Sequence, residues 1–107
     1  MPDEFDFEID ERPDRIDVRV RGDLDTNAVF RLEPTLDGLT RSGPSKEVVF
    51  DLSELTFVDS SGLGVLVAAD QRLRREGGTT RFLRAPDRVM RVFELAALDE
   101  TLPFEDG

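Results

Sequence analysis

The sequence contains no cysteine, no histidine and no tryptophan. Their absence excludes disulfide bonds, thiolate or imidazole metal ligands, Ser-His catalytic triads and histidine phosphoacceptors. Any chemistry must therefore use carboxylates, hydroxyls and arginines. On this basis we predict neither a metal site nor a bound cofactor.

Long hydrophobic runs are also missing. The longest apolar stretch, residues 62–69, is less than half of a membrane span, and the acidic N-terminus lacks the features of a signal peptide. A length of 107 residues fits one small domain. The sequence predicts a single domain over residues 1–107, with no membrane association and a cytoplasmic location.

Acidic residues exceed basic ones and give a net charge of −10, which repels nucleic acids and anionic membranes. The charge is uneven. Residues 1–17 hold eight acidic residues and two arginines, whereas residues 72–91 hold seven arginines and two acidic residues. Both segments are interpreted most simply as solvated faces, and oriented docking to a charged partner is the alternative.

The first half of the sequence changes from a strand pattern to a helix pattern. Apolar residues alternate at Phe5, Phe7 and Ile9 and again at Ile16, Val18 and Val20, which predicts a hairpin with its turn at residues 11–14. A helix with Val29, Leu32, Leu36 and Leu39 on one face then begins at Asp25-Thr26-Asn27 and stops at Ser42-Gly43-Pro44.

The second half has a βαβ pattern. Residues 47–52 predict a buried strand with Asp51 near its C-terminal end, and a helix follows from Asp59 to Gly77-Gly78. Residues 79–83 predict another strand, Pro86 opens a third helix, and residues 102–104 predict a short strand or an extended tail. The order of elements predicts an α/β fold: a mixed, four- to five-stranded sheet backed by helices mainly on one face.

The segment Asp59-Ser60-Ser61-Gly62 joins a predicted strand to a predicted helix. Unpaired backbone N–H groups and the positive end of the helix dipole favour an anion there. Asp59 or Ser60 would in any case cap the helix, and Gly62 would allow close packing. The two interpretations are compatible, because a cap hydroxyl that a kinase can reach becomes a phosphoacceptor.

Three segments together carry a family resemblance. They are Gly22-Asp23-Leu24-Asp25, Val49-Phe50-Asp51-Leu52 and Phe57-Val58-Asp59-Ser60-Ser61-Gly62-Leu63-Gly64. The sequence resembles the STAS family from Ile16 to Leu98 and, more narrowly, the bacterial anti-sigma factor antagonists.

The resemblance implies a partner: an anti-sigma factor that is also a serine kinase. It implies phosphorylation of Ser60, with Asp25 and Asp59 close to it and Ser61 as a neighbouring hydroxyl. Asp23 and Gly62 complete the expected binding surface. Family members usually continue into a further C-terminal helix, which we expect to be missing here either natively or by truncation. The resemblance leaves self-association open.

Other functions stay open at this point. A STAS domain can also be a scaffold or subunit that does not switch, in a stressosome-like or lipid-transport assembly. A receiver-like domain using Asp51 would need a lysine late in the chain, but the only lysine is Lys46. A hydrolase using Asp25 and Asp59 would need a pocket that a small domain rarely encloses. We therefore expect a regulatory protein rather than an enzyme.

Overall fold

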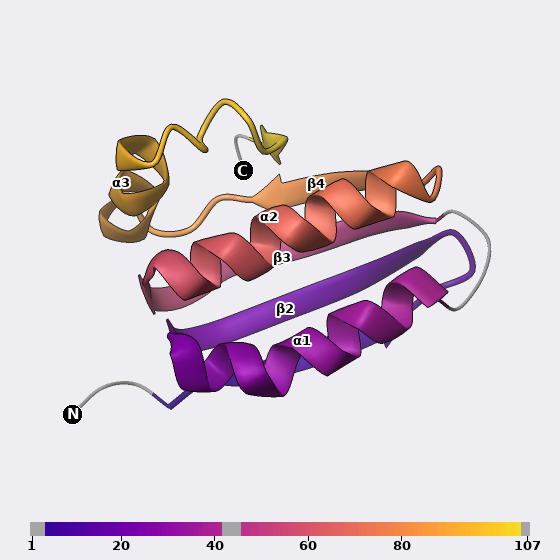
Figure 1. Ribbon diagram of the computed structural model, residues 1–107, viewed down its shortest axis with the longest axis horizontal. Helices are drawn as coiled ribbons and strands as arrows, with labels where there is room; N and C mark the ends of the chain where they lie inside the picture. The colour runs from indigo at the N-terminus through magenta and orange to yellow at the C-terminus, as the bar shows by residue number, and fades with distance from the viewer. Residues whose placement is uncertain (1–3, 42–45, 106–107) are drawn as a thin grey trace.

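The computed structural model describes residues 4–41 and 46–105 (Figure 1). The Ser42-Gly43-Pro44 helix stop lies outside these residues. Strands and helices follow one another in this order: β1 (Asp6–Glu11), β2 (Arg15–Leu24), α1 (Thr26–Arg41), β3 (Glu47–Val58), α2 (Ser60–Arg75), β4 (Thr79–Leu83), α3 (Asp87–Leu95) and β5 (Phe104–Glu105).

The five strands form one mixed sheet whose spatial order, β1-β2-β3-β4-β5, is the order along the chain. β1 and β2 form the antiparallel hairpin that the alternating pattern predicts, closed by a 2.8 Å bond from Arg12 N to Arg15 O. The remaining pairs, β2–β3, β3–β4 and β4–β5, are parallel. The α/β fold with a mixed sheet is therefore confirmed, with five strands.

The helices cover one face of this sheet. In β2 the side chains of Ile16, Val18 and Val20 are buried in the core that the helices also line, while the residues between them are charged. The core continues into β4 and β5: the ring of Phe82 in β4 stacks on that of Phe50 in β3 at 4.7 Å between centroids and lies 5.6 Å from that of Phe104 in β5. Figure 1 shows α1 and α2 lying along the sheet. The opposite face carries ion pairs, among them Arg19–Asp51.

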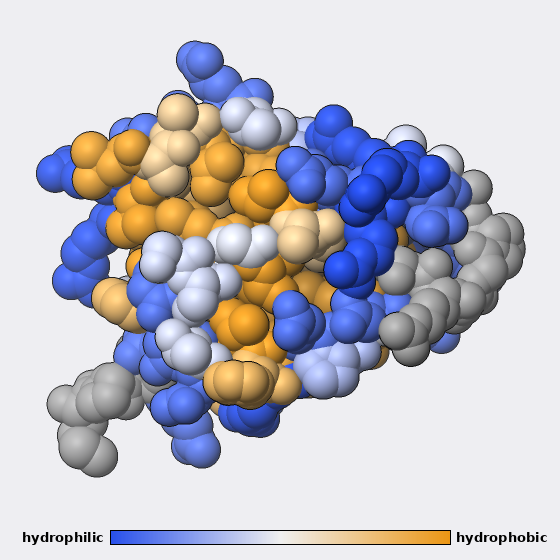
Figure 2. All heavy atoms as spheres, in the orientation of Figure 1, coloured by the Kyte–Doolittle hydropathy of each residue, from blue (hydrophilic) through white to orange (hydrophobic). Residues whose placement is uncertain are grey.

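The helix-covered face is itself uneven. Figure 2 shows hydrophobic residues gathered around α2 and α3, and hydrophilic residues over the C-terminal end of α2. That end carries Arg72, Arg74 and Arg75 in its last turn. The arginine-rich segment noted in the sequence is thus spread over the end of α2, β4 and α3 rather than over one element.

The expectation that Asp51 lies near the C-terminal end of its strand is wrong. β3 does not end near Asp51 but continues to Val58, so that Asp51 lies within the strand. β4 pairs with β3 only as far as Asp51, beside Leu83, whereas β2 stays paired with β3 up to Val58. Irregular register between β2 and β3 leaves Ser53 and Glu54 exposed while Leu55 and Val58 are buried. The polar residues taken as a strand end are therefore the exposed part of a longer strand.

Asp51 is held by local contacts. Its Oδ1 accepts hydrogen bonds from Ser53 N at 3.0 Å and Ser53 Oγ at 2.6 Å, and its Oδ2 lies 3.5 Å from Arg19 Nε. Partial burial acts to raise the pKa of Asp51, but the hydrogen bonds from Ser53 and the charge of Arg19 hold it below its ordinary value.

Candidate functional site

Two parallel strands bring two aspartates to the same end of the sheet. Leu24 and Val58, the last residues of β2 and β3, are partners in the register. Asp25 and Asp59 come next in the chain, and the backbone N–H of Asp59 still bonds to Leu24 O at 3.4 Å. Each aspartate precedes a helix, so that α1 and α2 begin side by side at this edge (Figure 1).

Asp59 caps α2. Its backbone is extended, and its Oδ1 accepts hydrogen bonds from Gly62 N at 3.0 Å and from Ser61 Oγ at 2.6 Å. Desolvation acts to raise the pKa of Asp59, yet the bonds from Ser61 and Gly62 outweigh it, and the pKa is lowered. Asp59 is therefore a carboxylate at neutral pH and accepts hydrogen bonds without donating any.

Ser60 is the first residue of α2 and is exposed. Among the described residues, no hydrogen bond engages its hydroxyl. The first turn of a helix tolerates added negative charge because its N–H groups are unpaired and the helix dipole is positive there. Ser60 thus combines a free hydroxyl, solvent access and a backbone that favours an anion.

The start of α1 has the same arrangement. Asp25 Oδ1 accepts a hydrogen bond from Ala28 N at 3.0 Å. The next residue, Thr26, is exposed, and its Oγ1 lies 3.2 Å from Ser61 Oγ in the first turn of α2. The two helix starts are thus linked through side chains as well as through the sheet.

Glycine is required at two positions around these caps. A Cβ on Gly62 would lie 2.5 Å from Leu24 O and 2.8 Å from Val58 Cγ2, so a side chain there would push α2 away from the sheet. Gly22 has a φ of +83°, and a Cβ would lie 2.3 Å from Glu4 O. Gly64 differs, because a Cβ there would meet nothing within 4 Å.

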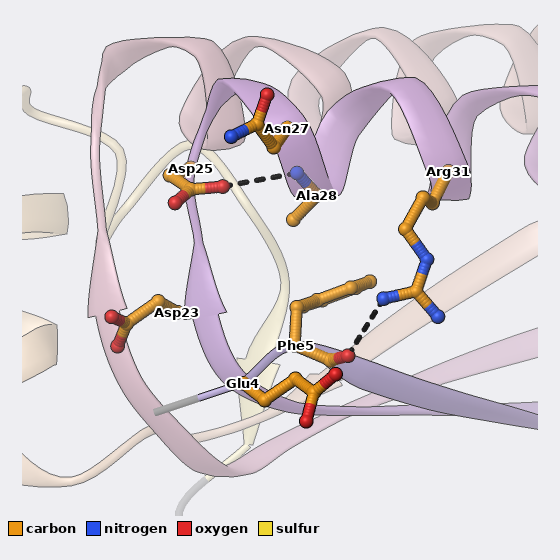
Figure 3. Close-up of a pocket in the computed structure, with 7 residues that line it drawn as sticks. All are labelled: Glu4, Phe5, Asp23, Asp25, Asn27, Ala28 and Arg31. Atoms are coloured by element: carbon orange, nitrogen blue, oxygen red, sulfur yellow. Dashed lines mark hydrogen bonds between the residues drawn. The ribbon is translucent and has the colours of Figure 1, made fainter. Parts of the chain in front are cut away.

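A hollow of about 350 Å³ adjoins the start of α1 (Figure 3). It is lined by Glu4, Phe5, Asp23, Asp25, Asn27, Ala28 and Arg31. Arg31 donates a 2.8 Å hydrogen bond to Phe5 O, and its guanidinium carbon lies 5.7 Å from the centre of the Phe5 ring. The lining has three carboxylates against one guanidinium, so the hollow carries net negative charge.

Asp23 links this hollow to the end of β3. Its Oδ1 accepts a 2.7 Å hydrogen bond from Thr56 Oγ1, and it is paired in the register with Phe57. Phe57 is 48% exposed as a residue, which is unusual for a large aromatic residue in a strand. In residues 4–41 and 46–105 no group of three or more acidic side chains is placed to hold a metal ion.

The residues singled out in the sequence fall into one region. The structure brings Asp25, Asp59, Ser60, Ser61 and Gly62 to adjoining helix starts, with Asp23 on the neighbouring strand end. Thr26 and Phe57 were not predicted from the sequence as residues of the functional site. Thr26 could have been found from its sequence context, because Leu24-Asp25-Thr26 repeats the pattern of Val58-Asp59-Ser60.

Comparison with known proteins decides the family. The profile of the STAS domain matches residues 6–107. The chain belongs to the STAS domain family. Relatives of this STAS domain include the anti-sigma-B factor antagonist of Listeria monocytogenes, 30% identical over 101 residues that cover 94% of this chain and 88% of the relative. That of Staphylococcus aureus is 29% identical, covering 85% and 83%.

Solved structures agree with this STAS fold. An anti-sigma factor antagonist from Mycobacterium paratuberculosis superimposes with a TM-score of 0.85 at 27% identity, covering 100% of this chain and 90% of that one. In the described part of this STAS domain, every helix is too short or too polar to span a bilayer.

Proposed function

We propose that this STAS domain is an anti-sigma factor antagonist that binds an anti-sigma factor with serine kinase activity, and that phosphorylation of Ser60 ends the binding. In the unphosphorylated form, the complex frees a sigma factor for transcription in the cytoplasm. The observation that carries this proposal is the exposed, unengaged hydroxyl of Ser60 beside the carboxylate of Asp59. The names of the relatives support the same partner class.

Phosphorylation would change the charge of the site sharply. The kinase transfers the γ-phosphoryl group of ATP to Ser60 Oγ; the new P–O bond forms as the bond to ADP breaks, and the hydroxyl proton leaves to a base. The phosphate adds about −1.5 to −2 charges. The helix dipole tolerates that charge within the domain. At an interface that already contains Asp25 and Asp59, the same charge adds like-charge repulsion with these two carboxylates, and it must lose its hydration when the complex forms.

The negative hollow supports a basic contact from the partner. Glu4, Asp23 and Asp25 line it together with the ring of Phe5. A lysine or arginine side chain pairs its charged end with carboxylates while its aliphatic stem lies on apolar surface. We therefore propose that this hollow contributes to partner docking next to the Ser60 switch.

Phe57 supplies an apolar part of the same surface. It is half exposed at the end of β3, beside Asp23 and just before Asp59. Exposed aromatic residues often carry much of the energy of an interface, because they bury large area with little loss of conformational freedom. We propose that partner contacts extend from the start of α2 to Phe57.

The proposed role is regulatory and requires no catalysis by this chain. The experiment that tests it is incubation with the cognate anti-sigma kinase, ATP and Mg²⁺, followed by mass spectrometry of the phosphopeptide. We expect one phosphate on Ser60, none on Ser60→Ala, and an unchanged result for Thr35→Ala, which removes a hydroxyl on α1 away from the helix starts, as the control. Stable binding without phosphorylation would instead favour a scaffold that does not switch.

A further inference from the structure

The starts of α1 and α2 are built in the same way. In each, a parallel strand ends in an apolar residue, an aspartate caps the helix, and a residue with a hydroxyl opens it. The two cap bonds, Ala28 N to Asp25 and Gly62 N to Asp59, are both 3.0 Å. Thr26 thus occupies in α1 the position that Ser60 occupies in α2.

The hydroxyl groups of Thr26 and Ser61 can be assigned as donors or acceptors from the number of protons that each carries. Ser61 has a single hydroxyl proton and directs it to Asp59 Oδ1 at 2.6 Å. Asp59 is ionised, so it cannot return a proton. In the 3.2 Å contact between Thr26 Oγ1 and Ser61 Oγ, the donor must therefore be Thr26.

The result is a chain of hydrogen bonds that runs from Thr26 through Ser61 to Asp59. It starts on α1 and ends on the cap of α2. Bonds in such a chain polarise one another and strengthen each other. The hydroxyl protons of Thr26 and Ser61 are both used in this series of hydrogen bonds, whereas the hydroxyl of Ser60 takes no part in it.

We propose that Thr26 is a positioning residue: its hydroxyl, acting through Ser61, fixes the start of α2 against the start of α1. As a consequence, the start of α1 with Asp25 and the start of α2 with Ser60 present one rigid surface to a partner. The second half of this proposal rests on the proposed function, because it concerns the anti-sigma partner. The first half concerns the isolated domain alone.

Three variants test the proposal. Thr26→Val removes the hydroxyl and keeps the shape, Thr26→Ser keeps the hydroxyl, and Thr35→Val is a control elsewhere on α1. In the free protein, amide hydrogen exchange measured by NMR is expected to become severalfold faster at Gly62 and Leu63 in Thr26→Val. Thr26→Ser and Thr35→Val are expected to match wild type.

The partner is then titrated into each variant by calorimetry. We expect Thr26→Val to bind about three- to tenfold more weakly, as the loss of one net hydrogen bond implies, and Thr26→Ser to bind like wild type. Unchanged exchange at Gly62 and Leu63 in Thr26→Val overturns the link between the helices. Faster exchange with unchanged affinity overturns its role in presenting the surface.

Failure of the proposed function gives a different result. If wild type itself does not bind the anti-sigma partner, the partner half falls together with the proposed function. The exchange rates then still decide whether Thr26 fixes the start of α2. Faster exchange and weaker binding in Thr26→Val, both restored in Thr26→Ser, are the outcome that supports both halves.

Discussion

Ser61 donates its hydroxyl proton to the carboxylate of Asp59 over 2.6 Å, while Ser60, the residue between them, makes no such bond within the described part of the chain. Two adjacent serines thus differ in chemistry. The proton of Ser61 is committed to a helix cap, whereas that of Ser60 makes no hydrogen bond within residues 4–41 and 46–105. This difference supports the proposal that Ser60, rather than Ser61, is the phosphorylated residue.

Ser60→Ala should keep its affinity for the anti-sigma partner and resist inactivation, whereas Ser60→Asp should bind well over tenfold more weakly. The alanine removes only an exposed hydroxyl, and the aspartate adds like charge beside Asp59. Titration calorimetry measures both affinities, and thermal melts check that both variants are folded. Equal affinity of Ser60→Asp and wild type would contradict an electrostatic switch.

Gly62→Ala should destabilise the domain by about 1 to 3 kcal/mol, because its Cβ has no room between α2 and the strand ends. Gly64→Ala in the same helix is the matched control, since a Cβ there meets nothing within 4 Å. It should raise stability by up to about 1 kcal/mol, as expected for replacing an exposed helical glycine. Urea unfolding gives both values, and similar effects at the two positions would rule out the packing argument.

Asp59→Asn should reduce stability at neutral pH and lose this effect in acid. The pKa of Asp59 is lowered in the folded protein, so the unfolded chain binds a proton more readily. The carboxylate therefore stabilises the fold above about pH 4, and this contribution disappears as the pH falls through the folded pKa.

Unfolding curves of wild type and Asp59→Asn between about pH 7 and pH 2.5 should thus converge in acid. Asp14→Asn, in the exposed turn between β1 and β2, serves as a control with no cap to lose. A difference between wild type and Asp59→Asn that stays constant over this range would mean that charge at the cap does not matter.

Glu4→Gln should slow association with the anti-sigma partner about two- to tenfold at low salt, if a basic side chain docks in the hollow of Figure 3. The effect should shrink as salt screens the charges. Glu76→Gln, at the far end of α2, removes the same charge away from the hollow. Stopped-flow kinetics compare the two, and equal slowing would indicate only a general charge effect.

The sequence by itself determined the local features of this protein. Alternation of apolar residues set the hairpin of β1 and β2, because a strand buried on one side needs that period. The Asp59-Ser60-Ser61-Gly62 segment set the start of α2, because its cap bonds span only three residues. These interactions are short in sequence, so the local residues suffice to specify them.

Contacts between residues far apart in the sequence were decided only by the tertiary structure. The sequence placed Asp51 at a strand end, but pairing with β2 beyond the end of β4 extends β3 to Val58. The same parallel register sets Leu24 beside Val58, and so brings Thr26 within 3.2 Å of Ser61. The register between strands depends on packing of the whole sheet against its helices. It therefore cannot be predicted from the residues at either helix start alone.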